Sequence, residues 1–286
     1  MPKQLGSSLF SVEDIFHRLK DFKHSLPAFS GTHLPLYFVK VDVKSCFDTI
    51  PQDKLLSIIQ SVVSKRAYTI CRRAEVNPPN KHEYRNSGTF SNRPTIRYLY
   101  EGRAAGHRSD RALQDGSGIS SKPAAITVDT VSEQVEQRDN LLALLYEHVQ
   151  RNVVKFGKKY FRQVTGVPQG SVLSTLLCSF FYGDMESKHL SFLEDENSLL
   201  LRLIDDFLLI TTERRHAVRF LETMHTGVPD YGVFIKSEKT TTNFDVNIGG
   251  NRIYGIRERE FPYCGITIDT KTLDLSKAVE RRTCGA

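Results

Sequence analysis

The chain has 286 residues, 40% of them hydrophobic and 25% charged, and its net charge of +6 favours a polyanionic partner without requiring one. Its length allows one large domain or two smaller ones, and its five scattered cysteines, without a Cys-x-x-Cys pair, argue against a zinc site or a disulfide framework and for a reducing compartment. No apolar run reaches the roughly 18 residues that span a bilayer, and residues 1–8 carry no signal-peptide pattern, so we expect no membrane partner.

The first predicted elements are a helix, a buried strand and a second helix. Residues 11–14, Ser-Val-Glu-Asp, resemble a capping box, and the apolar periodicity after them predicts an amphipathic helix that ends near Pro27. Residues 34–43 are rich in β-branched and aromatic side chains, which predicts a buried strand with Asp42 near its carboxyl end. Because a helix is expected to begin at Pro51, Asp42 lies at a junction between strand and helix.

The chain then changes character. Residues 77–125 contain few aliphatic side chains, several tyrosines and twice as many basic as acidic residues. Such a segment either binds nucleic acid through phosphate contacts and base stacking or is a solvated, partly disordered insertion, and composition leaves both open. The apolar spacing over 128–149 next predicts a longer helix, and 153–164 resembles a hairpin that turns at Gly157 and carries several lysines.

A loop rich in glycine and proline precedes an apolar helix expected over 172–185. The loop, residues 165–171, contains Gly166, Pro168 and Gly170, which predict an unusual backbone with little side-chain bulk. A base pair or a sugar can approach such a backbone closely. A plain connecting loop is the alternative interpretation.

Two adjacent carboxylates, Asp205 and Asp206, lie inside the nearly apolar run 199–211, whose length suits two short strands and a turn. Burying both as anions is costly, because each raises the pKa of the other, and a divalent cation is the simplest compensating charge. An exposed hairpin turn is the alternative, since Asp is common in turns.

Three further elements are expected downstream. They are a helix over 213–226, a strand over 233–242 and a last strand over 261–269 that contains a glycine, which marks a bulge or a close backbone approach. The second of these carries Lys236 and Lys239, and each lysine by itself is interpreted as a solvated surface charge.

The order of these elements favours an α+β fold, a ferredoxin-like antiparallel sheet with helices packed on one face. In that topology the end of the first strand lies beside the central hairpin, so Asp42 and Asp205 can share two divalent cations about 4 Å apart, as in in-line phosphoryl transfer. Magnesium suits such a site because it prefers oxygen ligands and shares its shell with substrate phosphates.

Three groups of residues together resemble the palm of reverse transcriptases, and more narrowly of the telomerase reverse transcriptases. They are Val-Lys-Val-Asp-Val at 39–43 with Phe-Asp-Thr-Ile-Pro-Gln-Asp at 47–53, Gly-Val-Pro-Gln-Gly-Ser-Val-Leu-Ser-Thr-Leu-Leu-Cys at 166–178, and Leu-Arg-Leu-Ile-Asp-Asp-Phe-Leu-Leu-Ile-Thr at 201–211. The narrower resemblance rests on Ser-Thr-Leu-Leu-Cys where retroelement and intron enzymes usually have Ser-Pro, on Leu-Arg-Leu-Ile before the Asp pair, and on the long insertion before Gly166.

This resemblance implies site residues. Asp42, Asp205 and Asp206 match the catalytic triad that holds two Mg²⁺ ions, with Asp42 and Asp205 as the direct ligands, and Lys239 matches a lysine that reaches the triphosphate as a candidate general acid. Four residues match the nucleotide-binding positions, where the Phe47 ring would exclude a 2′-hydroxyl: Val43, Phe47, Gln169 and Gly170. Three residues match the primer grip, with Tyr where the family usually has Trp: Tyr263, Cys264 and Gly265.

The resemblance also implies a function. The chain is expected to be an RNA-templated DNA polymerase that extends chromosome 3′ ends in the nucleus, at telomeres. Its implied partners are a telomerase RNA that carries the template, a telomeric single-stranded DNA 3′ end and deoxynucleoside triphosphates. Two alternatives stay open: a reverse transcriptase of the retroelement or group II intron type, and a truncated, non-catalytic nucleic-acid-binding palm.

The expected domains follow the same family. Residues 1–30 lead from the fingers into the palm, 31–65 and 151–286 form the palm through the primer grip, and 66–150 form a mostly helical or irregular insertion in the fingers. The family's first finger strands, its thumb and its RNA-binding domain are not expected in these residues. We therefore expect a fragment that does not synthesise DNA processively by itself.

Overall fold

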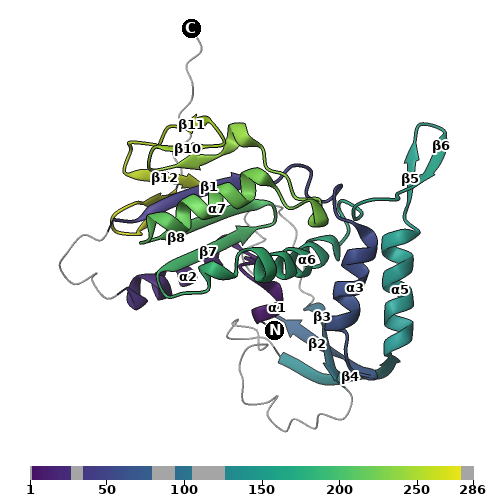
Figure 1. Ribbon diagram of the computed structural model, residues 1–286. Coiled ribbons are helices and arrows are strands. Elements are labelled where there is room, and N and C mark those ends of the chain that lie inside the picture. The colour runs from purple at the N-terminus through teal and green to yellow at the C-terminus, as the bar shows by residue number, and fades with distance from the viewer. Residues whose placement is uncertain (1, 27–34, 79–93, 105–125, 278–286) are drawn as a thin grey trace. The chain divides into compact units, whose positions relative to one another are not determined.

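A four-stranded antiparallel sheet lies at the centre of the fold, in the strand order β7-β8-β1-β9 (Figure 1). Its strands are β1 (Tyr37–Asp42), β7 (Ser198–Leu203), β8 (Asp206–Thr211) and β9 (Thr241–Thr242). β1 and β8 pair with Asp42 opposite Asp206, and β7 and β8 form the hairpin expected from the apolar run 199–211. The sheet therefore brings the end of the first strand to the turn of the hairpin.

The computed structural model describes residues 2–26, 35–78, 94–104 and 126–277. The chain divides into two compact units. The larger unit is formed by Met1–Val62 with His148–Ala286 and contains the central sheet, and the smaller unit is Val63–Glu147.

One face of the central sheet packs against a helix and a second hairpin. Phe38 of β1 and Leu208 of β8 lie in one buried cluster with Ile15 and Leu19 of α2 (Val12–Ser25) and with Phe261. Phe261 belongs to a hairpin of strands β12 (Glu260–Tyr263) and β13 (Ile266–Asp269). An apolar core of the larger unit therefore lies between this face of the sheet and α2.

The opposite face packs against α6 (Ser174–His189) and α7 (Arg214–Thr226). α7 contacts both β1 and β8, and the ring of Tyr182 in α6 lies edge-on to the Phe207 ring, with centroids 6.0 Å apart. The expectation that helices cover only one face is therefore wrong, and α2 is the exception. The physical reason is that successive buried residues of β8, from Phe207 to Thr211, point to opposite faces, so both faces must be covered.

Local signals explain where the helices begin. The Ser11 hydroxyl accepts a hydrogen bond from the Asp14 amide, and the Asp14 carboxylate accepts one from the Ser11 amide, which confirms the expected capping box of α2. The helices expected over 172–185 and 213–226 are observed as α6 and α7, and that expected at Pro51 as α3 (Gln52–Val62). None of the helices in the described residues is long and apolar enough to cross a membrane.

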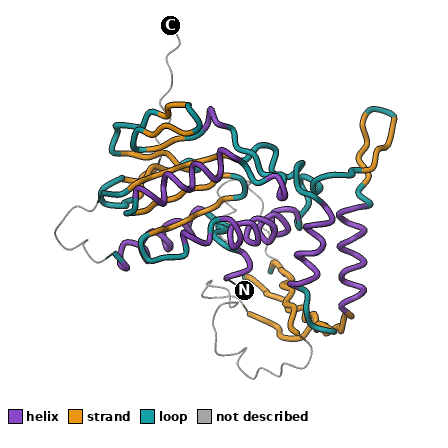
Figure 2. The backbone as a smooth tube through the Cα atoms, in the orientation of Figure 1, coloured by secondary structure: helices purple, strands orange, loops and turns teal. Residues whose placement is uncertain are grey.

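Shorter elements complete the larger unit, several of them paired strands (Figure 2). They are α1 (Pro2–Leu5), β5 (Val153–Phe156), β6 (Lys159–Arg162), β10 (Val246–Ile248), β11 (Asn251–Ile253), β14 (Leu275–Lys277) and the 3₁₀ turns η1 (Ser191–Leu193), η2 (Pro229–Tyr231) and η3 (Ser237–Lys239). β5 and β6 form the hairpin that the sequence predicts around Gly157.

The smaller unit differs from the sequence-based expectation. It contains an antiparallel sheet in the order β3-β2-β4, with β2 (Ala67–Asn77), β3 (Thr95–Ala104) and β4 (Ile126–Gln137). α5 (Arg138–Gln150) begins here and ends in the larger unit. The described part of the insertion is therefore mostly strand rather than helical or irregular.

The prediction of a helix over 128–149 is wrong for its first half, which forms the strand β4. The valines at 128, 131 and 135 have a helical spacing, but the segment is rich in β-branched residues, which favour a strand, and pairing with β2 makes it one. Residues 79–93 and 105–125 of the basic segment lie outside the described residues, and its residues 95–104 form the strand β3.

Two further strands are interrupted. Residues 233–242 contain two isolated bridges, from Val233 to Val228 and from Ile235 to Val43, followed by the turn η3 and the two residues of β9. Residues 261–269 are two strands rather than one, because Cys264 and Gly265 have φ of 46° and 81° and close a two-residue turn. Positive φ at both central residues is the geometry that tight hairpins prefer.

Candidate active site

Three carboxylates meet at one edge of the central sheet. Asp42 ends β1 and is 8% exposed, Asp206 begins β8 opposite it, and Asp205 lies in the turn between β7 and β8. The Val43 amide donates a hydrogen bond of 3.1 Å to the Asp205 carbonyl, which ties the end of β1 to this turn. Asp205 and Asp206 are half-buried, so the Asp pair is not an exposed hairpin turn.

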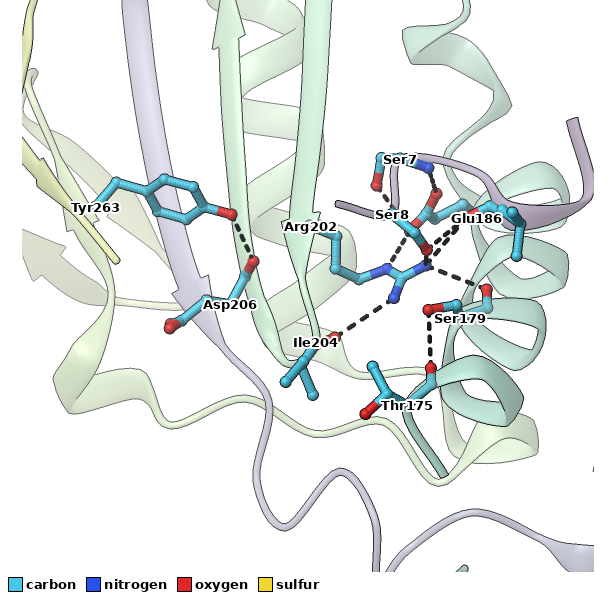
Figure 3. A network of polar contacts seen from close by, with 10 residues as sticks. Ser7, Ser8, Thr175, Ser179, Glu186, Arg202, Ile204, Asp206 and Tyr263 are labelled. Carbon is cyan, nitrogen blue, oxygen red and sulfur yellow. Dashed lines mark hydrogen bonds and ion pairs between the residues drawn. The ribbon is translucent and has the colours of Figure 1, made fainter. Parts of the chain in front are cut away.

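The turn before the Asp pair has an unusual backbone. Ile204 has a φ of 60°, in the left-handed region that a β-branched residue rarely adopts. The Arg202 guanidinium donates to the Ile204 carbonyl at 3.4 Å (Figure 3). Such a strained position persists only where surrounding contacts determine it, so Arg202 helps to hold the turn that presents Asp205.

Arg202 is fully buried and belongs to a polar network between β7, α6 and the N-terminal segment (Figure 3). Its Nε lies 2.6 Å from Glu186 Oε1, and its Nη2 lies 2.6 Å from Ser8 Oγ. Glu186 in turn accepts hydrogen bonds from the Ser7 amide and hydroxyl, at 2.7 and 2.9 Å. In the sequence, this arginine served only as part of a family motif. A lone arginine in an apolar run is also a signal for a buried ion pair.

Two lysines neutralise Asp42. Lys236 Nζ lies 2.6 Å from Oδ1 and Lys239 Nζ lies 2.9 Å from Oδ2. Burial acts to raise the pKa of Asp42, but the hydrogen bonds and charges of these lysines outweigh it and leave that pKa below its usual value. The sequence identified Lys239 as a site residue, but it took Lys236 for a surface charge. The spacing of three residues between the lysines was the available signal.

Asp205 and Asp206 have different surroundings. Burial, and then the negative charges of Asp206 and Asp42, raise the pKa of Asp205. Asp206 has a cation nearby, because Lys40 Nζ lies 3.8 Å from its Oδ1. Lys40 was not identified from the sequence.

The predicted primer-grip residues lie against Asp206. The Tyr263 hydroxyl donates to the Asp206 carbonyl at 3.0 Å (Figure 3), and Cys264 Sγ lies 3.6 Å from Asp206 Oδ2. Burial and the Asp206 charge raise the pKa of Cys264 to about 12, so its thiol stays protonated and can donate to the carboxylate. Gly265 is exposed, with open space around it.

The three carboxylates offer oxygen donors to a divalent cation. Carboxylate oxygens are the ligands that Mg²⁺ prefers, and the raised pKa of Asp205 reflects negative charge that a cation would compensate. However, no three His, Cys, Asp or Glu side chains among the described residues lie in a position to hold a metal ion. The residues nevertheless have the right chemistry for a cation. The ammonium groups of the two lysines occupy the Asp42 oxygens, so Asp42 must release at least one of them to bind a metal ion.

The predicted nucleotide-binding residues come from two loops that lie together. The Val167 amide donates to the Phe47 carbonyl at 2.7 Å, and Gln169 Nε2 lies 3.2 Å from Asp48 Oδ1. Phe47 is half-buried, whereas Val43 is fully buried and bridges to Ile235. Asp48 was not identified as a site residue.

The two glycines of the loop have different roles. Gly166 has a φ of 78°, and a side chain there would collide with the backbone of Phe47 and Asp48, so its small size serves packing within the chain. The interpretation that Gly166 leaves room for a base pair or a sugar is therefore wrong. Gly170 has a φ of 81° and open space around it, which leaves room for a ligand at this position.

The Gln52 side chain anchors the same loop by hydrogen bonds. This side chain is 8% exposed, and its Nε2 lies 3.0 Å from the Gly166 carbonyl, 3.1 Å from that of Val149 and 3.3 Å from that of Gln163. The sequence indicated only that Gln52 suits the first turn of a helix. A buried amide with three carbonyl partners depends on chain segments far apart in sequence, so nothing local could have shown it.

The fold agrees with comparisons to known proteins. A family model described as reverse transcriptase (RNA-dependent DNA polymerase) matches residues 120–268, about half of the chain. The chain belongs to the reverse transcriptase family. The matched residues include Asp205 and Asp206 but not Asp42.

Within this family the chain is similar to telomerase reverse transcriptases. That of Bos taurus is 36% identical over 96% of this chain and 24% of its own length, and that of Canis lupus familiaris is 35% identical with the same coverage. That of Oryza sativa subsp. japonica is 30% identical over 96% of this chain and 22% of its own length. The chain thus spans about a quarter of the curated relatives that it matches.

Solved structures show the same fold. Telomerase from Candida albicans, in complex with the TWJ fragment of telomeric RNA, has a TM-score of 0.62 at 20% identity and covers 97% of this chain and 36% of its own. Apo telomerase from Candida tropicalis also has a TM-score of 0.62, at 23% identity, over 96% of this chain and 37% of its own. The mixed α/β architecture with antiparallel sheets is therefore that of a reverse-transcriptase domain.

Proposed function

We propose that this chain is the catalytic palm, with part of the fingers, of an RNA-templated DNA polymerase of the telomerase type. It would add deoxynucleotides to a chromosome 3′ end. The observation that carries this proposal is the pairing of β1 with β8, which sets Asp42 opposite Asp206 with Asp205 in the adjoining turn. Reverse transcriptases generally use divalent metal ions, and three carboxylates at one sheet edge suit that chemistry.

Asp42 and Asp205 would hold two Mg²⁺ ions, with Asp206 supporting them. When bound, the ions would activate the primer 3′-hydroxyl and stabilise the charge that develops on the phosphates. The chain's own contribution is to orient the carboxylates through the left-handed turn at Ile204 and to keep Asp42 ionised through Lys236. Lys239, whose side chain is 55% exposed, would then leave Asp42, contact the triphosphate and donate a proton to the departing pyrophosphate.

The remaining site residues would position the substrates. Val43, Phe47, Gln169 and Gly170 would bind the incoming nucleotide, with the Phe47 ring excluding a 2′-hydroxyl and the open space at Gly170 admitting the nucleotide and the template. The primer end would lie at Tyr263, Cys264 and Gly265. The contacts of Tyr263 and Cys264 with Asp206 support this placement, because they join the primer grip to the carboxylates.

The partners and the place of action follow from the similarity to telomerases. A telomerase RNA would supply the template, as supported by the telomeric RNA in the Candida albicans complex. A telomeric single-stranded DNA 3′ end and deoxynucleoside triphosphates would be the substrates, in the nucleus at telomeres. The smaller unit, Val63–Glu147, would be the insertion in the fingers, and the larger unit would be the palm.

A non-catalytic nucleic-acid-binding palm is the second candidate. The two lysines on Asp42 favour it, because they already neutralise a carboxylate that a polymerase would offer to a metal ion. A reverse transcriptase of the retroelement or group II intron type gains no such support. Extension of a primer separates the two candidates.

The test is single-nucleotide extension of a DNA primer on an RNA template, with and without Mg²⁺, by a telomerase catalytic subunit that contains this chain. Asp205→Ala should lower the rate at least about 100-fold, because it removes electrostatic stabilisation of the transition state. The matched control is Asp230→Ala, an exposed carboxylate of η2. Extension by Asp205→Ala at the rate of the Asp230→Ala control would contradict the metal assignment. No extension by the wild type would leave the non-catalytic palm.

A further inference from the structure

The hairpin of β5 and β6 is a surface that the proposed function does not yet use. Its strands form a two-stranded sheet by themselves, and all eight of their residues are exposed (Figure 1). An isolated two-stranded hairpin is marginally stable in water. A partner that binds this hairpin would therefore order it further.

The hairpin is basic and aromatic at once. Residues 151–172 contain no acidic residue. Its exposed rings are those of Phe156, Tyr160 and Phe161, with exposed fractions of 81%, 68% and 52%. The strand register sets Lys155 opposite Tyr160 and Lys159 opposite Phe156, so each of these lysines has a ring across from it. Such an arrangement offers a phosphate contact beside a stacking surface, which is how proteins bind single-stranded nucleic acid.

The base of the hairpin is fixed to the loop of the proposed nucleotide site. The Gln163 amide donates to the Asn152 carbonyl at 3.0 Å, and Asn152 Nδ2 lies 2.9 Å from Gln163 Oε1. Gln52 then joins the Gln163 carbonyl to that of Gly166. A strand bound by the hairpin is therefore connected, through a few hydrogen bonds, to the loop that carries Gln169 and Gly170.

We propose that this hairpin binds the single-stranded RNA flank of the template. The inference rests on the proposed function for the identity of the strand. Exposed rings stack on unpaired bases, whose faces a duplex keeps covered, so the ligand is single-stranded. It is the template rather than the primer, because the hairpin is attached at Gly166 to the loop that carries Gln169 and Gly170, whereas the proposed primer grip at Tyr263 lies against Asp206.

The experiment measures binding of the 286-residue chain to fluorescent RNA–DNA hybrids by anisotropy. One hybrid is blunt, one has a single-stranded RNA overhang at the 5′ end of the template, and one has a single-stranded DNA overhang at the primer strand. In the wild type, the RNA overhang should raise the affinity. Tyr160→Ala should lower the affinity for the RNA overhang roughly tenfold, because one stacked base is lost, whereas Tyr160→Phe should keep the wild-type affinity.

The lysines have a separate signature. The double variant Lys155→Gln, Lys159→Gln should bind the RNA overhang with a weaker salt dependence. The slope of log K against log salt concentration should fall in magnitude by about 1.4, since each phosphate contact on a single strand contributes about 0.7. The matched control, Lys3→Gln with Lys20→Gln, changes two exposed lysines elsewhere and should leave the slope unchanged. If Tyr160→Ala weakens binding of the blunt hybrid equally, or weakens binding of the DNA overhang alone, the assignment to the template RNA is overturned.

The outcomes also separate this inference from the proposed function. Asp205→Ala should keep the overhang's contribution to binding. If the subunit extends primers but the RNA overhang adds no affinity, the hairpin inference fails alone. If the overhang adds affinity that Tyr160→Ala removes, while no primer is extended, the polymerase proposal fails and the hairpin stands as an RNA site. If the chain binds no hybrid and the subunit extends no primer, both are overturned.

Discussion

At the scale of residues, the site depends on charged side chains that lie against specific partners. Asp42 lies against two lysines, Asp206 against a lysine and a protonated thiol, and Arg202 against Glu186. An ion pair of this kind contributes little net stability, but removing one partner leaves an uncompensated charge. The pairs therefore serve mainly to fix where the carboxylates lie.

Arg202→Met should destabilise the larger unit by about 3–5 kcal/mol, since it leaves Glu186 buried and unpaired. The double variant Arg202→Met, Glu186→Met should recover most of that stability, because the unpaired charge is gone. Unfolding in urea measures both. If Arg202 also positions the turn at Ile204, primer extension should stay low in the double variant despite recovered stability. Full activity there would show that Arg202 serves stability alone.

At the scale of elements, two glycines of one loop have the same backbone handedness but differ in what surrounds them. Gly166 and Gly170 both have positive φ, near 80°, but only Gly166 lies against the chain's own backbone. Any side chain at either position adopts an unfavourable conformation. At Gly166 a side chain would also collide with the Phe47 carbonyl.

This pair of glycines makes a matched comparison. Gly170→Ala should lower the free energy of unfolding by only about 1–2 kcal/mol, the cost of the left-handed conformation. Gly166→Ala should cost clearly more, because the loop must move away from Phe47 as well. Chemical denaturation measures the difference. Equal losses for the two variants would show that the loop at Gly166 relaxes without resistance.

At the scale of the whole molecule, the chain forms two compact units, and the larger one is built from two segments that are distant in sequence. The central sheet joins β1 from the first segment to β7, β8 and β9 from the second. Units with their own cores can open independently, so they need not share one stability.

The cysteines report on each unit separately. Cys71 is buried in the smaller unit, whereas Cys46 and Cys178 are buried in the larger. Thiol labelling under native conditions, followed by mass spectrometry, should show faster labelling of Cys46 and Cys178 in the Arg202→Met variant and an unchanged rate at Cys71. A parallel increase at all three cysteines would mean that the two units unfold as one.

Much of the fold could be predicted locally. The capping box at Ser11 and the apolar hairpin around the Asp pair depend on neighbours in sequence, and both are observed. The spacing of the valines at 128, 131 and 135 predicts a helix where the structure has the strand β4, and pairing with β2 excludes the helix. The hairpin at Cys264 was taken for one strand because positive φ at a cysteine has no signal in sequence.

By itself, the sequence determined the family, the helices α2, α6 and α7 and the hairpin that contains Asp205 and Asp206, because motif residues and short-range periodicity are local. The tertiary structure alone decided that Lys236 joins Lys239 on Asp42, that Arg202 reaches the turn at Ile204 and that the sheet is covered on both faces. These features depend on which distant segments meet, and that is set by packing of the whole chain rather than by any one stretch of it.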